Sequence, residues 1–591
     1  MKNKKIMPVL AGILFLILIA IICVIVAIIE KNTPTKEKAD VYEYFSVDKE
    51  GNEAGLVVRD QLLEEKAYVF DGAVYVRYGT VYEYLNERIY WDSNENVLLY
   101  ALPTELVKAD IGSKDYYQGK NKNSIDTVIV KTEGDDTYIA LDFVQLFTNM
   151  EYEYYEEPSR VVIETDTRTI DSTEVKKINS ESKAEKYCVV REKADIKSPI
   201  LKSLEKEEEM ELLKKGKKWS KVRTKDGYIG YILNKYVTET EEKTLSRDFE
   251  EPAYTNIRKD YTINMAWHQV TNSGANNNLL TTIANTKGLT TISPTWFALI
   301  DNEGSVSSLA SQSYVNYAHQ LGLEVWGLVA DFNNDRIPID VNTLLSFTSK
   351  REKIINQLIA AAIENNLDGI NVDFELISKE GAPHFLEFLR ELSIKCRNNG
   401  LVLSIDNYVP TESSMYYNRT EEGTVADYVI IMGYDEHYGG SAESGSVASL
   451  GFVKDGVERT LEEVPAEKVI LAMPFYTRLW SETPKTEEEI AASSDTEDFI
   501  PYTLGSTVYS MAKTETFLTS KGLEPEWNEE SGQNYVEYAE GEVTYKMWIE
   551  DEKSIEEKLK VMKEHGLAGV SAWKLGLEKA SVWDTILKYV N

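Results

Sequence analysis

The stretch DGINVDFE, residues 368–375, decides the fold of the C-terminal half of the chain. Side chains alternate along a strand, so Asn371, Asp373 and Glu375 share one face while the apolar residues between them share the other. The apolar face predicts a covering layer of helices, and the polar face predicts a row of side chains that points into a parallel sheet. Burying carboxylates is costly unless they pair or take part in chemistry. The stretch therefore predicts a site-bearing strand of an α/β protein.

Strand-like segments of this kind recur after Pro252 and alternate with amphipathic helical stretches, the pattern of βα units on a parallel sheet. The eight segments are INMAWH from Ile263, TTISPTWF from Thr290, EVWGLVAD from Glu324, GINVDFE from Gly369, LVLSID from Leu401, YVIIMGYD from Tyr428, VILAMPFY from Val469 and GVSAWKL from Gly569. Eight strands close a (β/α)8 barrel, whose sites lie at the C-terminal ends of the strands. We predict a TIM barrel over residues 253–591, with an insertion at 481–568 that walls its cleft.

The N-terminus carries the strongest apolar signal in the chain. Residues 7–29 are uncharged and almost wholly apolar, and three lysines lie within residues 2–5. Such a run spans a bilayer, and its end shows no small-residue cleavage site. We predict that residues 1–30 form one uncleaved transmembrane helix with a cytoplasmic N-terminus, so that the bulk of the chain is extracytoplasmic. The charged residues 30–40 are expected to form a solvated tether.

Composition narrows the possible partners. Lys and Arg number 64 against 98 Asp and Glu, which gives a formal net charge of −34. A surface of that charge repels phosphate backbones, so we expect no nucleic-acid partner. Only three cysteines are present, one of them in the apolar run, so no disulfide framework is expected.

Residues 41–170 contain two similar segments, VYVRYGTVYEYLNERIYWDSNENVLLY from Val74 and TYIALDFVQLFTNMEYEYYEEPSRVVI from Thr137. Each predicts a strand, a short helix and a hairpin, so we expect an α+β repeat domain. The pattern resembles the repeated stalk-like domain found beside copper amine oxidases. All five histidines of the chain lie beyond residue 260, so no copper site is expected here.

Residues 186–238 predict a small all-β domain of short strands punctuated by glycine. The strand Trp219-Ser220-Lys221-Val222, the Asp226-Gly227 turn and Gly230-Tyr231-Ile232 resemble a bacterial SH3 module, which implies the cell wall as a partner. Trp219 is either a core residue or a ligand-facing ring, and the small size of the domain favours the core. An acidic linker at residues 238–251 is expected to separate this module from the barrel.

The DGINVDFE strand resembles the DGxDxDxE signature of glycoside hydrolase family 18, the chitinase-like family. Further matches on other predicted strands are Ser293-Pro294, Met432-Gly433-Tyr434-Asp435, Met473-Pro474-Phe475-Tyr476 and Trp573. The resemblance covers residues 254–591. The NVDFE variant and the late YKMWIEDEKSIEEKL segment are most similar to the branch of spore-cortex and cell-wall N-acetylglucosaminidases.

The resemblance implies substrate-assisted hydrolysis, in which the 2-acetamido oxygen of the substrate attacks the anomeric carbon. Glu375 is then the general acid and later the base, Asp373 stabilises the acetamido N–H, and Tyr434 holds the acetamido oxygen. The residues expected to contact substrate are Asn371, Asp435, Met432, Trp573, Trp296 and Tyr476. No metal or cofactor is expected, since His437 has no second ligand at metal-binding spacing.

Asn371 departs from the family pattern, in which most chitinases carry an aspartate. The middle carboxylate would then lack its like-charge neighbour, so we expect Asp373 to ionise more readily. Four tryptophans near strand ends are either sugar-stacking or core residues at this point: Trp267, Trp296, Trp326 and Trp480.

Three readings of function remain open from the sequence. Peptidoglycan is the favoured polymer for a wall-directed hydrolase, with chitin or an N-glycan as alternatives and with endo or exo action undecided. A non-catalytic, lectin-like surface protein is the second reading, and retention of Glu375 argues against it. The third is an adhesion protein that makes its contacts through the stalk-like repeats.

Overall fold

The structure, a computed structural model, describes residues 6–176, 187–332, 337–493 and 500–590. The chain divides into two compact units, and each is described by itself. The first comprises Met1–Trp91, Val97–Leu99 and Lys108–Glu251; the second comprises Asp92–Asn96, Tyr100–Val107 and Pro252–Asn591. The lysines expected to orient the anchor, Lys2, Lys4 and Lys5, lie outside the described residues.

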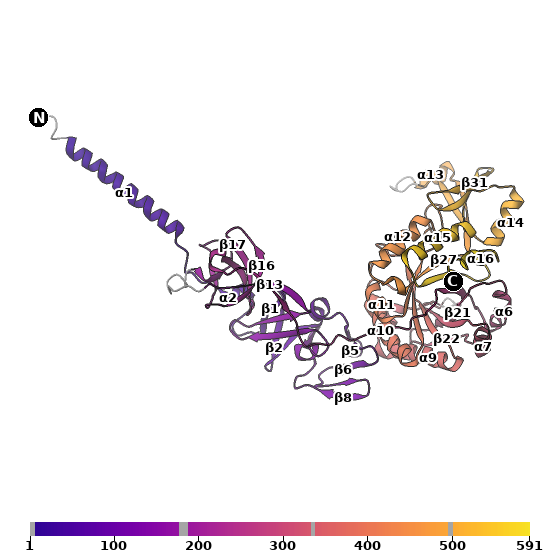
Figure 1. Cartoon of the computed structure of the whole chain (residues 1–591), viewed down its shortest axis with the longest axis horizontal. Helices are drawn as coiled ribbons and strands as arrows, with labels where there is room; N and C mark the ends of the chain where they lie inside the picture. Colours follow the sequence, from indigo (N-terminus) through magenta and orange to yellow (C-terminus); the bar gives the residue numbers. More distant parts are fainter. Residues whose placement is uncertain (1–5, 177–186, 333–336, 494–499, 591) are drawn as a thin grey trace. The chain divides into compact units, whose positions relative to one another are not determined.

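Helix α1 (Ile6–Asn32) contains the predicted apolar run (Figure 1). Its segment Met7–Asn32 is long and apolar enough to cross a membrane, and its side chains are exposed. The prediction of a solvated tether after it is wrong. The N–H of Thr35 donates to Ile196 O and that of Ala39 to Ile200 O, each at 2.9 Å, so the segment extends a neighbouring sheet.

Both predicted repeats fold as a strand, a short helix and a hairpin, which confirms that prediction. The first copy is β3 (Ala73–Arg77), α3 (Tyr78–Thr80), the π-helix η1 (Val81–Leu85), β4 (Ile89–Asp92) and β5 (Val97–Ala101). The second is β10 (Asp136–Ala140), α4 (Leu141–Val144), β11 (Met150–Tyr155) and β12 (Arg160–Thr165). Strands β3 and β10 pair antiparallel, so the two copies meet at equivalent positions.

The remaining strands of this region complete two sheets. One has the order β11-β12-β1-β2-β3-β10-β9 and the other β4-β5-β6-β7-β8. The added strands are β1 (Glu53–Val58), β2 (Gln61–Phe70), β6 (Leu106–Asp110), β7 (Asp115–Gln118), β8 (Asn121–Ser124) and β9 (Val130–Glu133).

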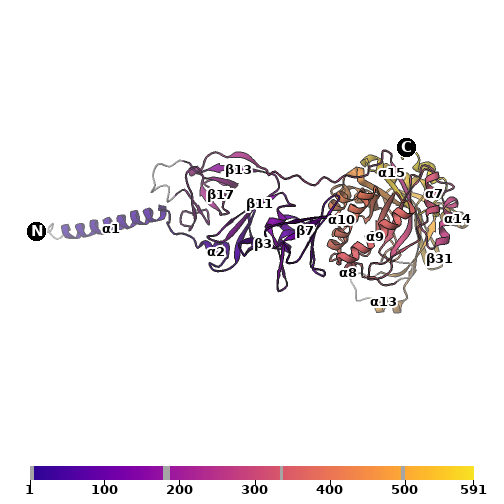
Figure 2. The ribbon, with the colours of Figure 1, turned by 90° about the horizontal axis from the view of Figure 1, so that it is seen from below.

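The SH3-like segment lies in a third sheet, of order β15-β14-β18-β17-β16-β13-β19, whose strands β13 and β17 are labelled in Figure 2. Its elements are β13 (Arg168–Glu174), β14 (Val189–Arg191), β15 (Ile200–Ser203), β16 (Glu209–Lys215), β17 (Trp219–Thr224), β18 (Ile229–Leu233), the 3-10 helix η2 (Asn234–Tyr236) and β19 (Glu241–Leu245). The expected linker at 238–251 is therefore partly a strand, because β19 pairs with β13.

One apolar cluster joins this sheet to the repeat region. Helix α2 (Val41–Phe45) places Phe45 against Val57 and Val162 of the repeats and against core residues of the SH3-like sheet. Trp219 is only half-buried and lies outside this cluster, so the preference for a core role is wrong. The first unit thus has a shared core rather than two separate ones.

The second unit is a closed barrel of eight parallel strands, and all eight predicted segments are confirmed. The strands are β20 (Ile263–His268), β21 (Thr291–Leu299), β23 (Glu324–Ala330), β24 (Gly369–Asp373), β25 (Val402–Tyr408), β26 (Tyr428–Met432), β27 (Val469–Pro474) and β33 (Gly569–Trp573). They follow one another in sequence order, and β20 closes the ring by pairing with both β21 and β33. A short strand, β22 (Val306–Ser308), pairs antiparallel with β21.

Helices surround these strands, as Figure 1 shows for α9, α10, α11 and α12. Apolar residues on their inner faces pack on the outward side chains of the strands and form the largest core cluster. The helices are η3 (Ser273–Asn278), α6 (Leu279–Thr282), α7 (Gln312–Gln320), α8 (Val341–Leu345), α9 (Thr348–Asn365), α10 (Ala382–Asn399), α11 (Arg419–Val425), α12 (Leu450–Leu461), η4 (Ala466–Lys468), α15 (Glu552–His565) and α16 (Val582–Ile586).

The predicted insertion between the last two barrel strands has its own sheet, of order β29-β28-β32-β31-β30. Its elements are β28 (Tyr476–Pro484), α13 (Glu487–Ser493), β29 (Tyr502–Ser510), α14 (Met511–Lys521), β30 (Glu526–Asn528), β31 (Gln533–Glu540) and β32 (Val543–Ile549). Strands β31 and β32 pair antiparallel on either side of Gly541 and form a hairpin.

Candidate active site

Strand β24 delivers its carboxylates to the C-terminal end of the barrel. Phe374 is buried and stacks on Phe385 and Phe388 of α10, which turns the side chains on either side of it inward. The strand ends at Asp373, so Glu375 belongs to the loop that follows and not to the strand itself. Both carboxylates nevertheless line one cavity, as the alternation predicted.

Glu375 is held at two points. The Tyr408 hydroxyl donates to Glu375 Oε2 at 2.8 Å, and the backbone N–H of Glu375 donates to Asp331 Oδ1 at 3.1 Å. The other oxygen of Asp331 accepts the N–H of Leu376 at 2.7 Å, which fixes the loop. Burial raises the pKa of Glu375; the Tyr408 hydrogen bond opposes this and the charge of Asp435 adds to it. A raised pKa suits a group that must donate a proton near neutral pH.

Asp373 does not ionise readily, contrary to the expectation from Asn371. Burial raises the pKa of Asp373 well above its usual range, and the nearby charge of Asp406 raises it further. The aspartate missing from β24 thus has a counterpart on β25. The expected ionisation of Asp373 was wrong because it took account of charges on β24 alone and not of Asp406 on β25.

Asn371 is fully buried beneath the cavity and does not line it. Contrary to the prediction, its side chain is not placed to contact a substrate in the cavity. Its Nδ2 donates to Asp406 Oδ1 at 2.7 Å and to Ser404 Oγ at 3.1 Å. Its Oδ1 accepts from Trp267 Nε1 at 2.9 Å and from Ser293 Oγ at 3.2 Å. All its hydrogen-bonding groups are engaged by protein, which makes it a structural residue.

The end of β26 supplies Met432, Tyr434 and Asp435 to the cavity wall. Asp435 has a φ of 57°, in the left-handed region, a conformation that directs its carboxylate to the rim. The Tyr476 hydroxyl donates to Asp435 Oδ1 at 2.6 Å. Tyr476 is therefore positioned behind Asp435 and acts through it.

The cavity itself measures about 250 Å³. Six of the nine predicted site residues line it: Asp373, Glu375, Met432, Tyr434, Asp435 and Trp573. Trp573 is half-buried and supplies an aromatic floor to the cavity; its ring centroid is 5.9 Å from that of Trp267, which is tilted by 58° and only 1% exposed. Such a floor suits the apolar face of a sugar ring.

Trp296 was predicted to contact substrate, and this prediction is wrong. Its ring is 1% exposed, its Nε1 donates to Asn276 Oδ1 at 2.8 Å, and it packs edge-on against Tyr314. It belongs to the core between strands and helices. Trp326 and Trp480 are likewise fully buried, and neither lines the cavity. Trp267 is also buried, but it is the one of the four tryptophans near strand ends that lines the cavity.

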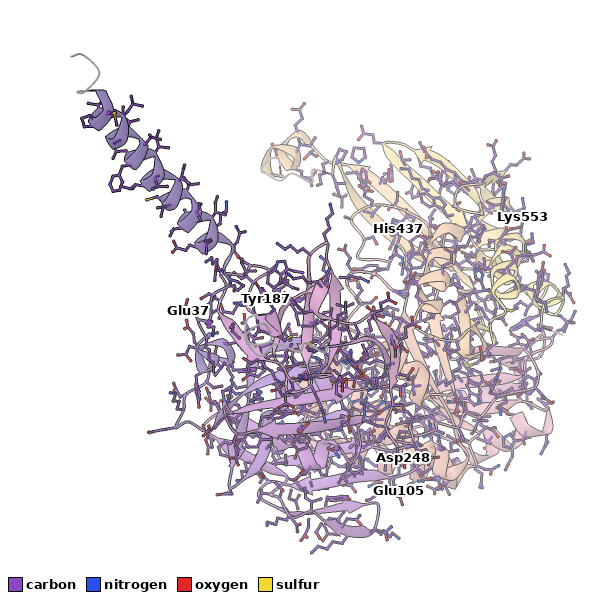
Figure 3. The ribbon with its side chains drawn as sticks, turned by 60° about the vertical axis from the view of Figure 1, so that its left-hand side comes forward. Glu37, Glu105, Tyr187, Asp248, His437 and Lys553 are labelled. Atoms are coloured by element: carbon purple, nitrogen blue, oxygen red, sulfur yellow. The ribbon has the colours of Figure 1, made fainter. Side chains whose placement is uncertain are left out.

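His437, seen in Figure 3, lies beyond the cavity with Nδ1 3.0 Å from Ser446 O. This contact fits the structural role expected of a lone histidine. Three contributors to the site were missed from the sequence: Asp331, Asp406 and Tyr408. The alternation on LVLSID would have placed Asp406 on the inward face, whereas nothing in EVWGLVAD showed that Asp331 binds the loop after another strand.

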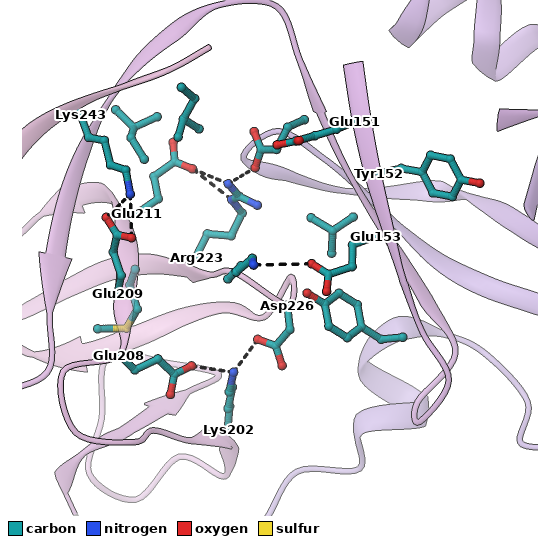
Figure 4. Close-up of a pocket in the computed structure, with 17 residues that line it drawn as sticks. Glu151, Tyr152, Glu153, Lys202, Glu208, Glu209, Glu211, Arg223, Asp226 and Lys243 are labelled. Atoms are coloured by element: carbon teal, nitrogen blue, oxygen red, sulfur yellow. Dashed lines mark hydrogen bonds and ion pairs between the residues drawn. The ribbon is translucent and has the colours of Figure 1, made fainter. Parts of the chain in front are cut away.

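A larger cavity, of about 760 Å³, lies in the first unit between strands β11 and β12 and the hairpin β16–β17 (Figure 4). Its charged groups are paired with one another, for example Arg223 with Glu211 at 2.9 Å and Lys202 with Asp226 at 2.6 Å. Burial alone would raise the pKa of Glu211, but Arg168 and Arg223 lower it. The pKa of Glu211 is thus lowered, whereas that of Glu375 in the barrel cavity is raised, so the barrel cavity is the better candidate for acid chemistry.

Comparison with known proteins agrees with this geometry. Residues 340–578 match glycosyl hydrolases family 18, residues 189–238 match the bacterial SH3 domain, and residues 57–163 match the copper amine oxidase N-terminal domain. An uncharacterized glycosylase of Bacillus subtilis is 26% identical over 300 residues, 49% of this chain and 81% of that protein. The cortical fragment-lytic enzyme of the same organism is 25% identical over 251 residues, 41% of this chain. The match spans 54% of that enzyme's own length.

Solved structures with a similar fold include the Bacillus cereus spore cortex-lytic enzyme, with a TM-score of 0.49 at 20% identity over 59% of this chain and 77% of that one. A chitinase from Chromobacterium violaceum has a TM-score of 0.47 at 20% identity over 55% of this chain and 98% of that one. The family match begins at the N-terminus of α8 and runs past the last barrel strand, and it includes both Asp373 and Glu375. Residues 340–578, which hold five of the eight barrel strands, are therefore a glycoside hydrolase family 18 domain.

Proposed function

We propose that the barrel hydrolyses the bond beside β-linked N-acetylglucosamine in a polysaccharide, by substrate-assisted catalysis with retention. The observation that carries the proposal is Glu375, a half-buried acid with a raised pKa that lines the same cavity as Trp573. Family 18 is an exception to the two-carboxylate mechanism, since the acetamido group of the substrate serves as the nucleophile.

Each residue of the cavity has a separate part in the proposed reaction. Glu375 protonates the leaving oxygen and then activates water as a base. Asp373 accepts the acetamido N–H as the positive charge develops, and Tyr434 donates its hydroxyl to the acetamido oxygen. Trp573 packs under the sugar ring, and Asp435, held by Tyr476, contacts the sugar at the rim.

Peptidoglycan is the polymer we favour, with a chitin-like polysaccharide as the alternative. Support comes from the bacterial SH3 domain and from the similarity to the cortical fragment-lytic enzyme of Bacillus subtilis. We further propose that α1 anchors the protein in the cell membrane by a single pass, with both folded units outside the cell. Wall contact through the SH3 domain would then hold the enzyme near its substrate.

The test is Glu375→Gln, which keeps the shape of the side chain and removes its proton. The rate on N-acetylated oligosaccharides should fall by roughly two to four decades, the usual loss when general acid catalysis is removed. Binding of the oligosaccharide should persist. Glu380→Gln is the matched control, because Glu380 is exposed and lies outside the cavity.

The nucleophile is tested with a substrate whose cleaved sugar carries a free amine. It should not turn over, whereas the N-acetylated form should yield products identified by mass from both peptidoglycan and chitin oligosaccharides. Turnover of the free-amine substrate would replace the proposal with a two-carboxylate mechanism. Full activity of Glu375→Gln would show that another group is the acid, whereas a wild-type protein that binds the oligosaccharide without cleaving it would favour a lectin-like protein.

A further inference from the structure

Two buried carboxyl groups reach the floor of the cavity from neighbouring strands. Asp373 ends β24, and Asp406 lies on β25, which runs parallel to it. The last residues paired between these strands are Val372 and Ile405, so Asp373 and Asp406 follow in register. Adjacent strands are about 4.8 Å apart, and both side chains line the same cavity.

The surroundings of Asp406 contain a hydrogen-bond donor and no neutralising charge. Asn371 Nδ2 donates to Asp406 Oδ1 at 2.7 Å, but an amide cannot take up the proton of a carboxyl group. Among the residues that the structure describes, no lysine or arginine forms an ion pair with Asp373 or Asp406. Asp373 is 8% exposed and Asp406 is 4% exposed, so water screens them little.

Two like charges held this close away from water cannot both ionise, and such a pair keeps one proton between its members. Asn371 adds no third charge on the same floor. The β24 motif has Asn371 where a second carboxyl group would precede Asp373 on the same strand. In this chain Asp406 supplies that carboxyl group from β25 and faces Asp373.

We propose that Asp406 is a positioning residue that shares one proton with Asp373, so that the pair carries a single negative charge when substrate binds. The inference rests on the substrate-assisted reaction proposed above. When the acetamido N–H approaches, the shared proton leaves the Asp373 oxygen and binds an oxygen of Asp406. Asp373 is then a carboxylate that accepts the N–H, and the total charge of the pair is unchanged.

The first measurement does not depend on activity. In a carboxyl pair whose pKa is raised by folding, the folded state holds a proton that the unfolded state releases, so stability falls as pH rises. Asp406→Asn, which keeps the shape and the bond from Asn371, removes that proton. In the full-length protein in detergent, the Tm of the variant relative to the wild type should rise steadily between pH 5 and pH 8.

The rescue variant places the second carboxyl group back on β24. Asn371→Asp combined with Asp406→Asn should restore the wild-type dependence of Tm on pH. Ser404→Ala is the matched control, because it removes the other acceptor of the Asn371 amide without changing charge. Its Tm should follow the same pH dependence as that of the wild type. If Asp406→Asn does not fold, Asn371→Asp alone should steepen the loss of Tm with pH, because a third carboxyl group retains a further proton.

The second measurement concerns catalysis. Asp406→Asn should lower kcat on an N-acetylated oligosaccharide at least tenfold with little change in KM, and the double variant should recover most of the loss. An unchanged pH dependence of Tm would overturn the shared proton. A changed pH dependence with wild-type kcat would overturn the positioning role. An inactive wild-type protein would instead overturn the proposed function, and the Tm comparison would still decide whether the proton is shared.

Discussion

Tyr408 ends strand β25 with its hydroxyl group 2.8 Å from Glu375 Oε2. Burial raises the pKa of Glu375, and this hydrogen bond to the ionised form limits the rise. In Tyr408→Phe the pKa of Glu375 should therefore be higher, and the protonated acid should persist to higher pH. Because the alkaline limb of kcat/KM reports the essential acid, that limb should move upward by about one pH unit.

Tyr416→Phe provides the comparison for this change. The Tyr416 hydroxyl donates to the Ile377 carbonyl at 2.9 Å, in the loop beyond Glu375, and does not touch a carboxylate. Its pH profile should overlay that of the wild type. An alkaline limb that moves downward in Tyr408→Phe, or moves equally in both variants, would contradict the role given to Tyr408.

Single residues also mark the limit of what the sequence predicted about the site. Glu375, Asp373, Tyr434, Asp435, Met432 and Trp573 were assigned to one cavity from motifs, and they line it. Asp331 and Asp406 were missed because their importance depends on contacts across strands that lie far apart in sequence. Trp296 was assigned wrongly because proximity to a strand end does not reveal which way a ring faces.

At the scale of elements, the loop after β24 depends on β23. Asp331 accepts the N–H groups of Glu375 and Leu376, and burial raises its pKa to about 6 despite those bonds. Asp331→Asn replaces one acceptor oxygen with an amide donor, so one N–H loses its partner and the loop shifts. Misplacement of a catalytic group by about 1 Å costs up to about 100-fold in rate, so kcat should fall within that range.

Asp301→Asn is a matched control for the loop. Asp301 also accepts two backbone N–H groups, those of Glu303 and Ser305, each at 2.9 Å, but it does not line the cavity. Steady-state kinetics should show a loss of kcat in Asp331→Asn alone. Equal losses in both variants would indicate general destabilisation rather than a displaced acid.

In the first unit, a buried ion cluster joins β12 to the hairpin β16–β17. Arg223 bonds Glu211 at 2.9 Å and also pairs with Glu164, and the side chains of Arg223 and Glu211 are 5% and 8% exposed. Glu211→Gln removes a negative charge that neutralises the arginines packed against it. The free energy of unfolding should therefore fall by about 1–3 kcal/mol. Glu209 forms an exposed ion pair with Lys243, so Glu209→Gln should lower the free energy of unfolding by less than about 1 kcal/mol.

The same cluster gives a pH dependence of stability that thermal unfolding can measure. Burial alone would raise the pKa of Glu211, but Arg168 and Arg223 bring it below the usual value. A carboxyl group with a lowered folded pKa stabilises the protein above its unfolded pKa, and this contribution disappears as pH falls through the folded pKa. The Tm difference between the wild type and Glu211→Gln should therefore shrink below about pH 4.5. A difference that stays constant down to pH 3 would contradict this assignment.

The strands of the barrel were predictable because each carries its own apolar run and is buried on both faces. Strand β19 and the bridge at Lys38 were not, because their residues are charged and exposed. Both segments pair because a neighbouring strand has an edge with free backbone hydrogen-bonding groups. The local sequence pattern of a segment does not show whether such an edge is present. The shared core of the first unit was missed for a related reason, since Phe45, Val57 and Val162 come from three separate segments.

At the scale of the whole molecule, the family match covers residues 340–578 and so only part of the second unit. The first three barrel strands, which precede it, supply Trp267 and Asp331 to the site. The pairing of β20 with β33 brings Trp267 there, and the pairing of β23 with β24 brings Asp331, so the site depends on the complete barrel. A fragment limited to residues 340–578 would lack the group that holds the Glu375 loop.

Under the proposed membrane anchoring, α1 ends at Asn32 and the folded chain begins directly after it. Helix α1 leaves large apolar side chains exposed, such as Leu14 at 62% and Phe15 at 63%, and a bilayer would cover them. Deleting residues 1–30 should therefore release a soluble protein with the wild-type Tm. Deleting residues 1–40 should also give a soluble protein, but one with a lower Tm.

The difference between the two truncations follows from the segment that extends the SH3-like sheet. The longer deletion removes the backbone bonds of Thr35 and Ala39 and the acceptor for Arg191, whose Nη2 donates to Thr35 O at 3.0 Å. Each lost hydrogen bond costs about 1 kcal/mol. Cell fractionation and thermal unfolding of both truncations provide the test. Membrane retention of the protein lacking residues 1–30 would show that a further segment binds the membrane, and equal Tm values would show that residues 31–40 do not stabilise the first unit.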